Sequence, residues 1–297
     1  MDRYGIAHTG TYKEEYSGDR NLYFTVGDTK FALIAGTFST NYGITPYYLE
    51  GNRSHCINMI HPMRGGGRIY RPSPQVFVDT LRYVEGLMGR KLEWEESTKL
   101  KRVMQMPKES VDENIPWDDL NKCFADVAAD YHEARKHVDV VIYYPHSGGQ
   151  FNVEPGEYTK QLVKMSAELG FDAVLAGHSH TSQRAELVNG KPCFYSLGNV
   201  SMSPGTFYSV PECLPEYGLA AHFYIGNKAI QRVTFSVFKM VQEAGVPMRI
   251  VPVDTLYETL NTHEKEALLA DLDVIHQRVT GRTMVETTPV REYELTE

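Results

Sequence analysis

The pattern of apolar positions predicts alternating helices and strands in the middle of the chain. Apolar residues recur at helical spacing over 118–134 and over 155–169. Each of these stretches leads into a strongly apolar run, at 138–144 and 172–176. Such runs are typical of strands that are buried on both faces of a sheet. The order helix, strand, helix, strand predicts an α/β architecture.

The flanking segments carry weaker patterns. Two β-rich runs, 22–26 and 30–35, flank a Gly-Asp-Thr turn and predict a hairpin. Ser73 and Pro74 form a helix start, and Gly89 ends that helix, whereas the polar stretch 90–117 is interpreted as a loop. Towards the end of the chain we expect a strand at 193–197, a hairpin across Gly226-Asn227, a helix carrying Leu268, Leu272, Ile275 and Val279, and a frayed tail over the final sixteen residues.

We therefore expect a layered sandwich of β-sheets flanked by helices. One domain would span 1–205 with an insertion at 60–117, and residues 206–297 would form an extension whose hairpin and helix pack on the same domain. Ile6 and Ala7 resemble the end of an element whose partner segment is not upstream. This predicts that the N-terminal strands of the fold are missing, either because the chain is a fragment or because it is a degenerate member of its family.

Composition and charge exclude several function classes. The 297 residues are 42% hydrophobic and 23% charged, which is typical of a globular protein. The formal net charge of -8 argues against nucleic acid as a partner. No apolar run approaches the ~20 residues of a membrane span, and no signal peptide is visible, so the chain as written is expected in the cytoplasm. The alternative is that the chain belongs to a longer parent protein that is membrane-anchored or exported. The scattered cysteines predict reduced thiols, with a disulfide left as an alternative.

Three histidines follow two of the predicted strands. His146 comes directly after the strand 138–144, and His178 and His180 follow the strand 172–176 in a Gly-His-Ser-His loop. In α/β sheets, ligands bind at the carboxyl ends of strands. Imidazole is the commonest nitrogen ligand for transition metals. We therefore expect these side chains to converge and to bind zinc, manganese or iron, although a histidine beside a strand can also be a packed or solvated residue.

Other motifs do not support a site. Residues 132–137 resemble a zincin helix, but their two histidines are five positions apart and lie on different helix faces. Neither Ser179 nor Ser196 stands in a nucleophile elbow, and no Walker A or strand-linked dinucleotide motif is present. A glycine-rich stretch carries three arginines that are candidates for anion binding, with a solvated loop as the alternative; they are Arg64, Arg68 and Arg71.

The ordered motifs from 119 to 203 resemble a known family, and the stretch 4–40 resembles its preceding segment. They are His146-Ser147-Gly148-Gly149-Gln150, then Pro155, Gln161 and Leu162, then Gly170-Phe171-Asp172-Ala173-Val174, Gly177-His178-Ser179-His180, Gln183, Gly190-Lys191-Pro192 and Tyr195-Ser196-Leu197-Gly198-Asn199. This set resembles the bacterial capsule-synthesis protein CapA family. That family is linked to poly-γ-glutamate synthesis and belongs to the calcineurin-like metallophosphoesterase superfamily.

The resemblance implies a two-metal centre held in part by His146, His178 and His180. It also implies positions around the ligands for Gln150, Gln183 and Asn199. Where the family commonly has Trp and Glu after the first histidine, this chain has Ser147 and Gln150, which removes a carboxylate. The family's early Asp-bearing strand ends and Asn-His element have no counterpart here, so the resemblance implies an incomplete metal site.

Two functions follow as hypotheses. The first is a CapA-like, metal-dependent phosphoesterase-type hydrolase that acts on an anionic small molecule or polymer. The second is a binding or assembly protein that retains the fold without a complete metal site. The sequence names neither the substrate, the metal nor the oligomeric state, and it leaves the enzyme question open.

Overall fold

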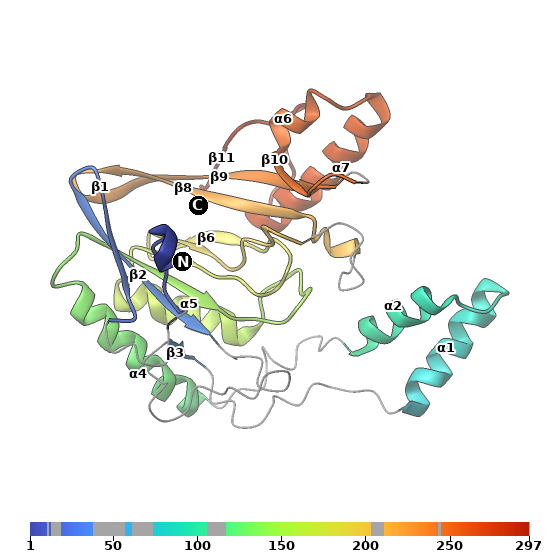
Figure 1. Ribbon diagram of the computed structural model, residues 1–297, viewed down its shortest axis with the longest axis horizontal. Helices are drawn as coiled ribbons and strands as arrows, with labels where there is room; N and C mark the ends of the chain where they lie inside the picture. The colour runs from blue at the N-terminus through green and yellow to red at the C-terminus, as the bar shows by residue number, and fades with distance from the viewer. Residues whose placement is uncertain are drawn as a thin grey trace.

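The computed structural model describes residues 1–10, 12, 19–37, 57–60, 74–105, 117–202, 211–242 and 245–296. Its larger sheet has seven strands in the order β1-β2-β4-β5-β7-β6, with β3 also paired to β2 (Figure 1). The pairs β2–β4, β4–β5 and β5–β7 are parallel, while β1 and β6 pair antiparallel at the two edges. The strands are β1 Leu22–Val26, β2 Thr29–Thr37, β3 Asn58–Met59, β4 Val140–His146, β5 Ala173–Leu175, β6 Ala185–Val188 and β7 Lys191–Phe194.

The second sheet is antiparallel and is built around one long strand. Strand β9 pairs with β8, β10 and β11, and the predicted hairpin across Gly226-Asn227 joins β8 to β9. The prediction of a frayed tail is wrong, because β11 lies in it and Tyr293, 4% exposed, pairs with Phe235. The strands are β8 Tyr217–Gly226, β9 Ala229–Val241, β10 Arg249–Pro252 and β11 Tyr293–Glu294.

The helices lie outside these sheets. Helices α4 and α5 cover one face of the larger sheet, and the second sheet with α7 lies over the other (Figure 1). The predicted loop at 90–117 is wrong in part, because it contains a helix, α2. The helices are α1 Pro74–Met88, α2 Trp94–Gln105, α4 Trp117–Ala134, α5 Glu157–Leu169, α6 Val253–Tyr257 and α7 Thr262–Thr280, with short 3-10 turns η1 Asp2–Tyr4 and η3 Pro211–Cys213.

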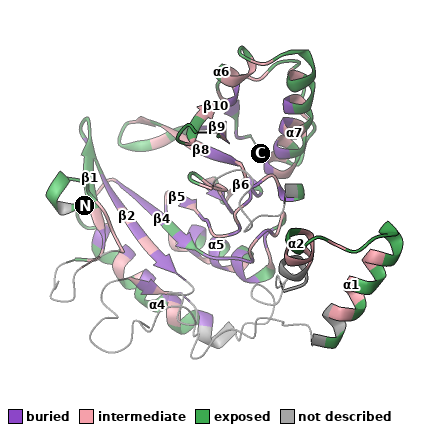
Figure 2. Ribbon diagram, turned by 45° about the vertical axis from the view of Figure 1, so that its right-hand side comes forward, coloured by how far each residue is buried: buried purple, intermediate pink, exposed green. Residues whose placement is uncertain are grey.

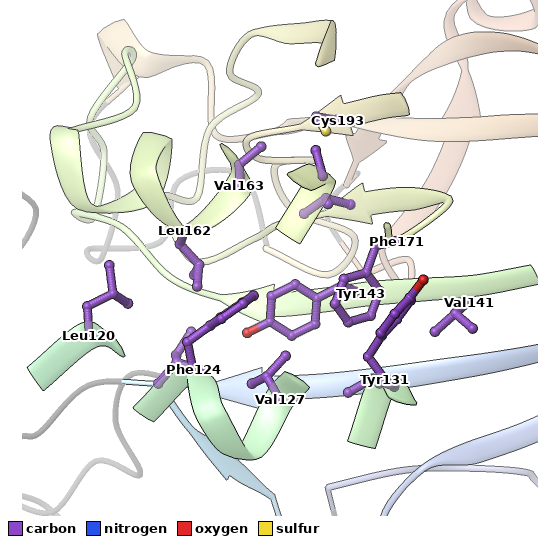
Figure 3. Close-up of a cluster of buried hydrophobic side chains, with 14 of the residues drawn as sticks. Leu120, Phe124, Val127, Tyr131, Val141, Tyr143, Leu162, Val163, Phe171 and Cys193 are labelled. Carbon is purple, nitrogen blue, oxygen red and sulfur yellow. The ribbon is translucent and has the colours of Figure 1, made fainter. Parts of the chain in front are cut away.

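The side chains of β4 alternate between two separate hydrophobic cores, one on each face of the larger sheet. Val141 and Tyr143 pack with α4 and α5, where Figure 3 shows Tyr143 among aromatic and aliphatic side chains. Val140 and Ile142 point to the opposite face and meet the β8–β9 hairpin. Because successive side chains of a strand point to opposite faces, an unbroken apolar run is what a strand between two layers requires. The central strands are accordingly buried along most of their length (Figure 2).

A third core joins α7 to the antiparallel sheet. The side chains Leu268, Leu272, Ile275 and Val279 of α7 are buried among residues that include Phe235 and Tyr217. Asn261 starts this helix with a capping box to Glu264. Across the described residues, no helix combines the length and the apolar character that crossing a membrane would need.

The layered α/β sandwich predicted from the sequence is confirmed. Its parallel strands β2, β4, β5 and β7 all end at one edge of the larger sheet, and this edge carries the predicted histidines. The three cysteines within the described residues, Cys123, Cys193 and Cys213, are free thiols.

Candidate metal centre

Strand pairing brings the two histidine segments together. His146 is the last residue of β4, and it forms a parallel bridge with Gly177, which follows β5. The amide of Ser147 donates to the carbonyl of Gly177 over 2.8 Å. The pairing of β4 with β5 therefore continues beyond the end of β5 and fixes where the Gly-His-Ser-His loop begins. Topology alone places His146 and His178 side by side, as the sequence predicted.

The two rings meet directly. His178 Nδ1 lies 2.8 Å from His146 Nε2, a hydrogen bond in which either ring can be the donor, and the ring centroids are 4.5 Å apart. The ring of His180 is farther away, with its centroid 6.0 Å from that of His178. His146 is exposed while His178 and His180 are half-buried, so the cluster opens to solvent at the sheet edge.

Asn199 orients His180. Its Oδ1 lies 2.8 Å from His180 Nδ1, and its Nδ2 donates to the carbonyls of His180 and Pro215 over 2.9 and 2.8 Å. Since an amide oxygen only accepts, His180 Nδ1 carries the proton and Nε2 is left with the lone pair. Asn199 follows β7, so the loops after three successive parallel strands contribute to the site. These contacts place Asn199 directly beside one of the predicted histidines.

The histidine loop has an unusual backbone. The φ angles of His178 and His180 are 117° and 59°, in the left-handed region that favours glycine. Each such residue costs ~1–3 kcal/mol and persists only where the surroundings hold it. Phe151 supplies part of that support, because its amide donates to the carbonyl of Ser179 and its ring stacks on His180, 5.5 Å between centroids at 26°. Sequence reasoning missed Phe151, since no local pattern marks it.

The remaining candidates are distributed around this centre. Gln183 Nε2 donates to the carbonyl of Asn152 over 2.7 Å, so it supports the loop that carries Phe151. Gln150 is half-buried in the same loop. The three arginines proposed for anion binding, Arg64, Arg68 and Arg71, lie outside the described residues.

Electrostatics keep the facing rings neutral. Removal from water lowers the pKa of His178 to about 3, and the neighbouring His146 and His180 add to this effect. The surrounding protein displaces part of the water around the His146 ring, and this desolvation, together with the nearby His180, also lowers the pKa of His146. A neutral imidazole offers a lone pair to a metal ion, which a protonated one cannot do.

The donor set fits one transition-metal ion in part. Two nitrogens that bind one tetrahedral ion at ~2.0–2.1 Å lie roughly 3.3 Å apart, close to the separation of His146 Nε2 and His178 Nδ1. His180 Nε2 is a candidate third donor, because Asn199 holds the proton on Nδ1. Within the described residues, however, no group of three or more His, Cys, Asp or Glu side chains has an arrangement that could hold a metal ion. Two nitrogens converge, and the third ring is held by Asn199 and Phe151 farther off.

Comparisons with known proteins agree with the motifs. The curated relative "PGA biosynthesis protein CapA" of Bacillus subtilis (strain 168) is 32% identical over 87 residues, 29% of this chain and 23% of that protein. The chain thus matches less than a quarter of that relative's length. A crystal structure of a hypothetical protein from Thermus thermophilus gives a TM-score of 0.31 at 12% identity, over 82% of this chain and 64% of the other, which is too distant to bear on fold or function. The family described as bacterial capsule synthesis protein PGA_cap matches residues 1–203, more than half of the sequence, and the chain belongs to this family.

Proposed function

We propose that this chain is a metal-dependent, phosphoesterase-type protein of the CapA kind that takes part in capsule or poly-γ-glutamate synthesis. Membership of the family supports the link to capsule synthesis. The observation that carries the metal-dependent part is the direct contact between His146 and His178 at the carboxyl ends of adjacent parallel strands. Zinc, iron or manganese is the class of ion that the proposal assigns to this edge.

The proposed ligand atoms follow from the hydrogen bonds. His146 would bind through Nε2 and His178 through Nδ1, so the ring that donates the hydrogen bond in the metal-free chain would move its proton to its remote nitrogen. His180 would bind through Nε2, because Asn199 holds its Nδ1 proton. A bound ion supplies Lewis-acid polarisation of a phosphoryl or carbonyl oxygen and an activated water. The substrate would be an anionic phosphoester or an amide polymer.

Metal content tests the proposal. We expect the chain, stripped with a chelator and reloaded with zinc or manganese, to retain one ion per chain by elemental analysis. Three neutral imidazoles cannot balance the charge of two dications, so one ion is the expected ceiling. His178→Ala removes the central donor and should abolish retention. The matched control is His263→Ala, which alters an exposed histidine in the first turn of α7 and should leave the metal content unchanged.

Two outcomes would overturn this assignment. Equal retention in His178→Ala and in the unchanged chain would place the ion elsewhere. Two tightly bound ions per chain would reveal further ligands within these residues.

A binding or assembly role is the second candidate. It is favoured by Gln150, an amide at the position where the resemblance implies a carboxylate. In this role the histidine edge would recognise an anionic polymer without cleaving it. Binding of poly-γ-glutamate by the metal-stripped chain, with no turnover of this polymer or of a phosphoester by the metal-loaded chain, would support this role against the hydrolase.

A further inference from the structure

Arg278 lies in the last turn of α7, and its guanidinium donates hydrogen bonds to uncharged oxygen atoms. Its Nη1 donates to the carbonyl of Cys213 over 2.8 Å and to Thr181 Oγ1 over 3.2 Å. Its Nη2 donates to the carbonyl of Glu212 over 3.1 Å. Within the described ranges, no carboxylate lies at ion-pair distance from this guanidinium. Partial burial of a charged group costs free energy. Because no surface ion pair among the described residues offsets this cost for Arg278, another role of its side chain is expected.

All three acceptors belong to the surroundings of His180. Thr181 follows His180 directly, and its hydroxyl also donates to the carbonyl of Cys213 over 2.6 Å. Cys213 Sγ in turn donates to the carbonyl of Phe151 over 3.2 Å, and the ring of Phe151 stacks on His180. Arg278 therefore reaches His180 by two routes, one along the chain through Thr181 and one across η3 to the stacked ring.

The backbone at His180 needs support of this kind. A non-glycine residue at a φ of 59° stays there only if its neighbours leave no better alternative. A planar guanidinium with several donors in a fixed fork can hold two chain segments at a set distance, which a flexible ammonium does less well. Here the fork bridges the turn η3 and the residue after His180, and it does so from a helix outside the segment 1–203 that the family matches.

We propose that Arg278 is a positioning residue for His180, which sets the orientation of that imidazole by clamping Thr181 to η3. The effect on the ring belongs to the metal-free chain. The effect on metal affinity rests on the proposed function, and the two are measured separately.

The test compares three variants of the full chain. Arg278→Met keeps most of the side chain's length but removes its donors, Arg278→Lys keeps the charge and one donor group, and Arg291→Met removes an exposed arginine that pairs with Asp254. In the metal-free protein, imidazole nitrogen and carbon resonances report the tautomer and surroundings of each ring. We expect the resonances of His180 to shift in Arg278→Met, to return part of the way in Arg278→Lys, and to stay in place in Arg291→Met. The ring of His222, which bonds to Ser236 in the other sheet, serves as an internal reference.

Cobalt titration supplies the second measurement. Loss of an outer group that orients a ligand lowers metal affinity by about 10–100-fold, so we expect a loss of at least about tenfold in Arg278→Met and a smaller one in Arg278→Lys. If the unchanged chain binds no cobalt, the proposed function fails while the resonances still decide the role of Arg278. The proposal is overturned if Arg278→Met lowers the melting temperature with the resonances of His180 unmoved. If that variant does not fold, Thr181→Val, which removes the hydroxyl that accepts from Arg278 and donates to the carbonyl of Cys213, must shift the same resonances, and a lack of shift would equally overturn the proposal.

Discussion

Tyr143 presents a buried hydroxyl whose removal should stabilise the fold. The residue is fully buried on β4, and none of the described residues forms a hydrogen bond with its Oη. Burial accordingly raises its pKa well above the usual value. A hydroxyl group that is buried without a partner costs ~1–3 kcal/mol relative to water. The variant Tyr143→Phe keeps the ring, which stacks on Phe171 with centroids 5.1 Å apart, and removes only the costly atom.

We expect the free energy of unfolding of Tyr143→Phe to rise by about 1–2 kcal/mol, because the small void left by the oxygen offsets part of the stabilisation. For a protein of this size that corresponds to a rise in melting temperature of roughly 2–4 °C for each kcal/mol. Calorimetry and urea unfolding would measure the gain. Tyr158→Phe is the matched control in the same core, because its hydroxyl donates to the carbonyl of Ile60. That variant should lose about 1–2 kcal/mol. Equal destabilisation of both variants would refute the reasoning, since it would show that Tyr143 Oη has a partner.

Two further predictions concern the same sheet. In Gly36→Ala the new Cβ would stand 2.9 Å from Tyr143 Oη and 3.0 Å from Ile60 Cγ2, so stability should fall by ~1–3 kcal/mol. The loss should be smaller in a Tyr143→Phe background, and strict additivity in the double-mutant cycle would contradict this contact. Burial raises the pKa of Cys193 to about 12, so its contribution to stability is complete below pH ~9 and is lost as the pH rises towards 12. Iodoacetamide at pH 8.5 should therefore leave Cys193 unmodified in the folded protein, and labelling at the rate of the unfolded chain would contradict it.

The local sequence pattern was enough to predict the helix and the strand that pack in the core with a regular periodicity. The run 138–144 became β4, and the helix before it became α4, because strands between two layers and helices on a sheet carry strong periodicities. The convergence of His146 and His178 followed from this topology alone. That these two histidines bind a metal ion remains a prediction.

Other features depend on contacts between distant segments, which no window of sequence displays. Helix α2 is polar on most positions, so its residues resemble a loop. Strand β11 is two residues long and is defined by its pairing with β9, more than fifty positions earlier. Phe151 and Arg278 reach His180 from segments with no motif of their own. Propensity and periodicity describe neighbours along the chain, whereas these roles are set by neighbours in space.

The pairing of β11 with β9 also bears on how the chain is made. During synthesis the parallel sheet can form with α4 and α5 as soon as β7 has emerged from the ribosome, since domains fold from the N-terminal side. The antiparallel sheet has to wait, because Tyr293 and Leu295 close the core beneath α7. Until then the apolar faces of β9 and α7 stay exposed on the growing polypeptide. The interval between emergence of β9 and emergence of residue 295 is thus the period in which this protein most needs protection by a chaperone.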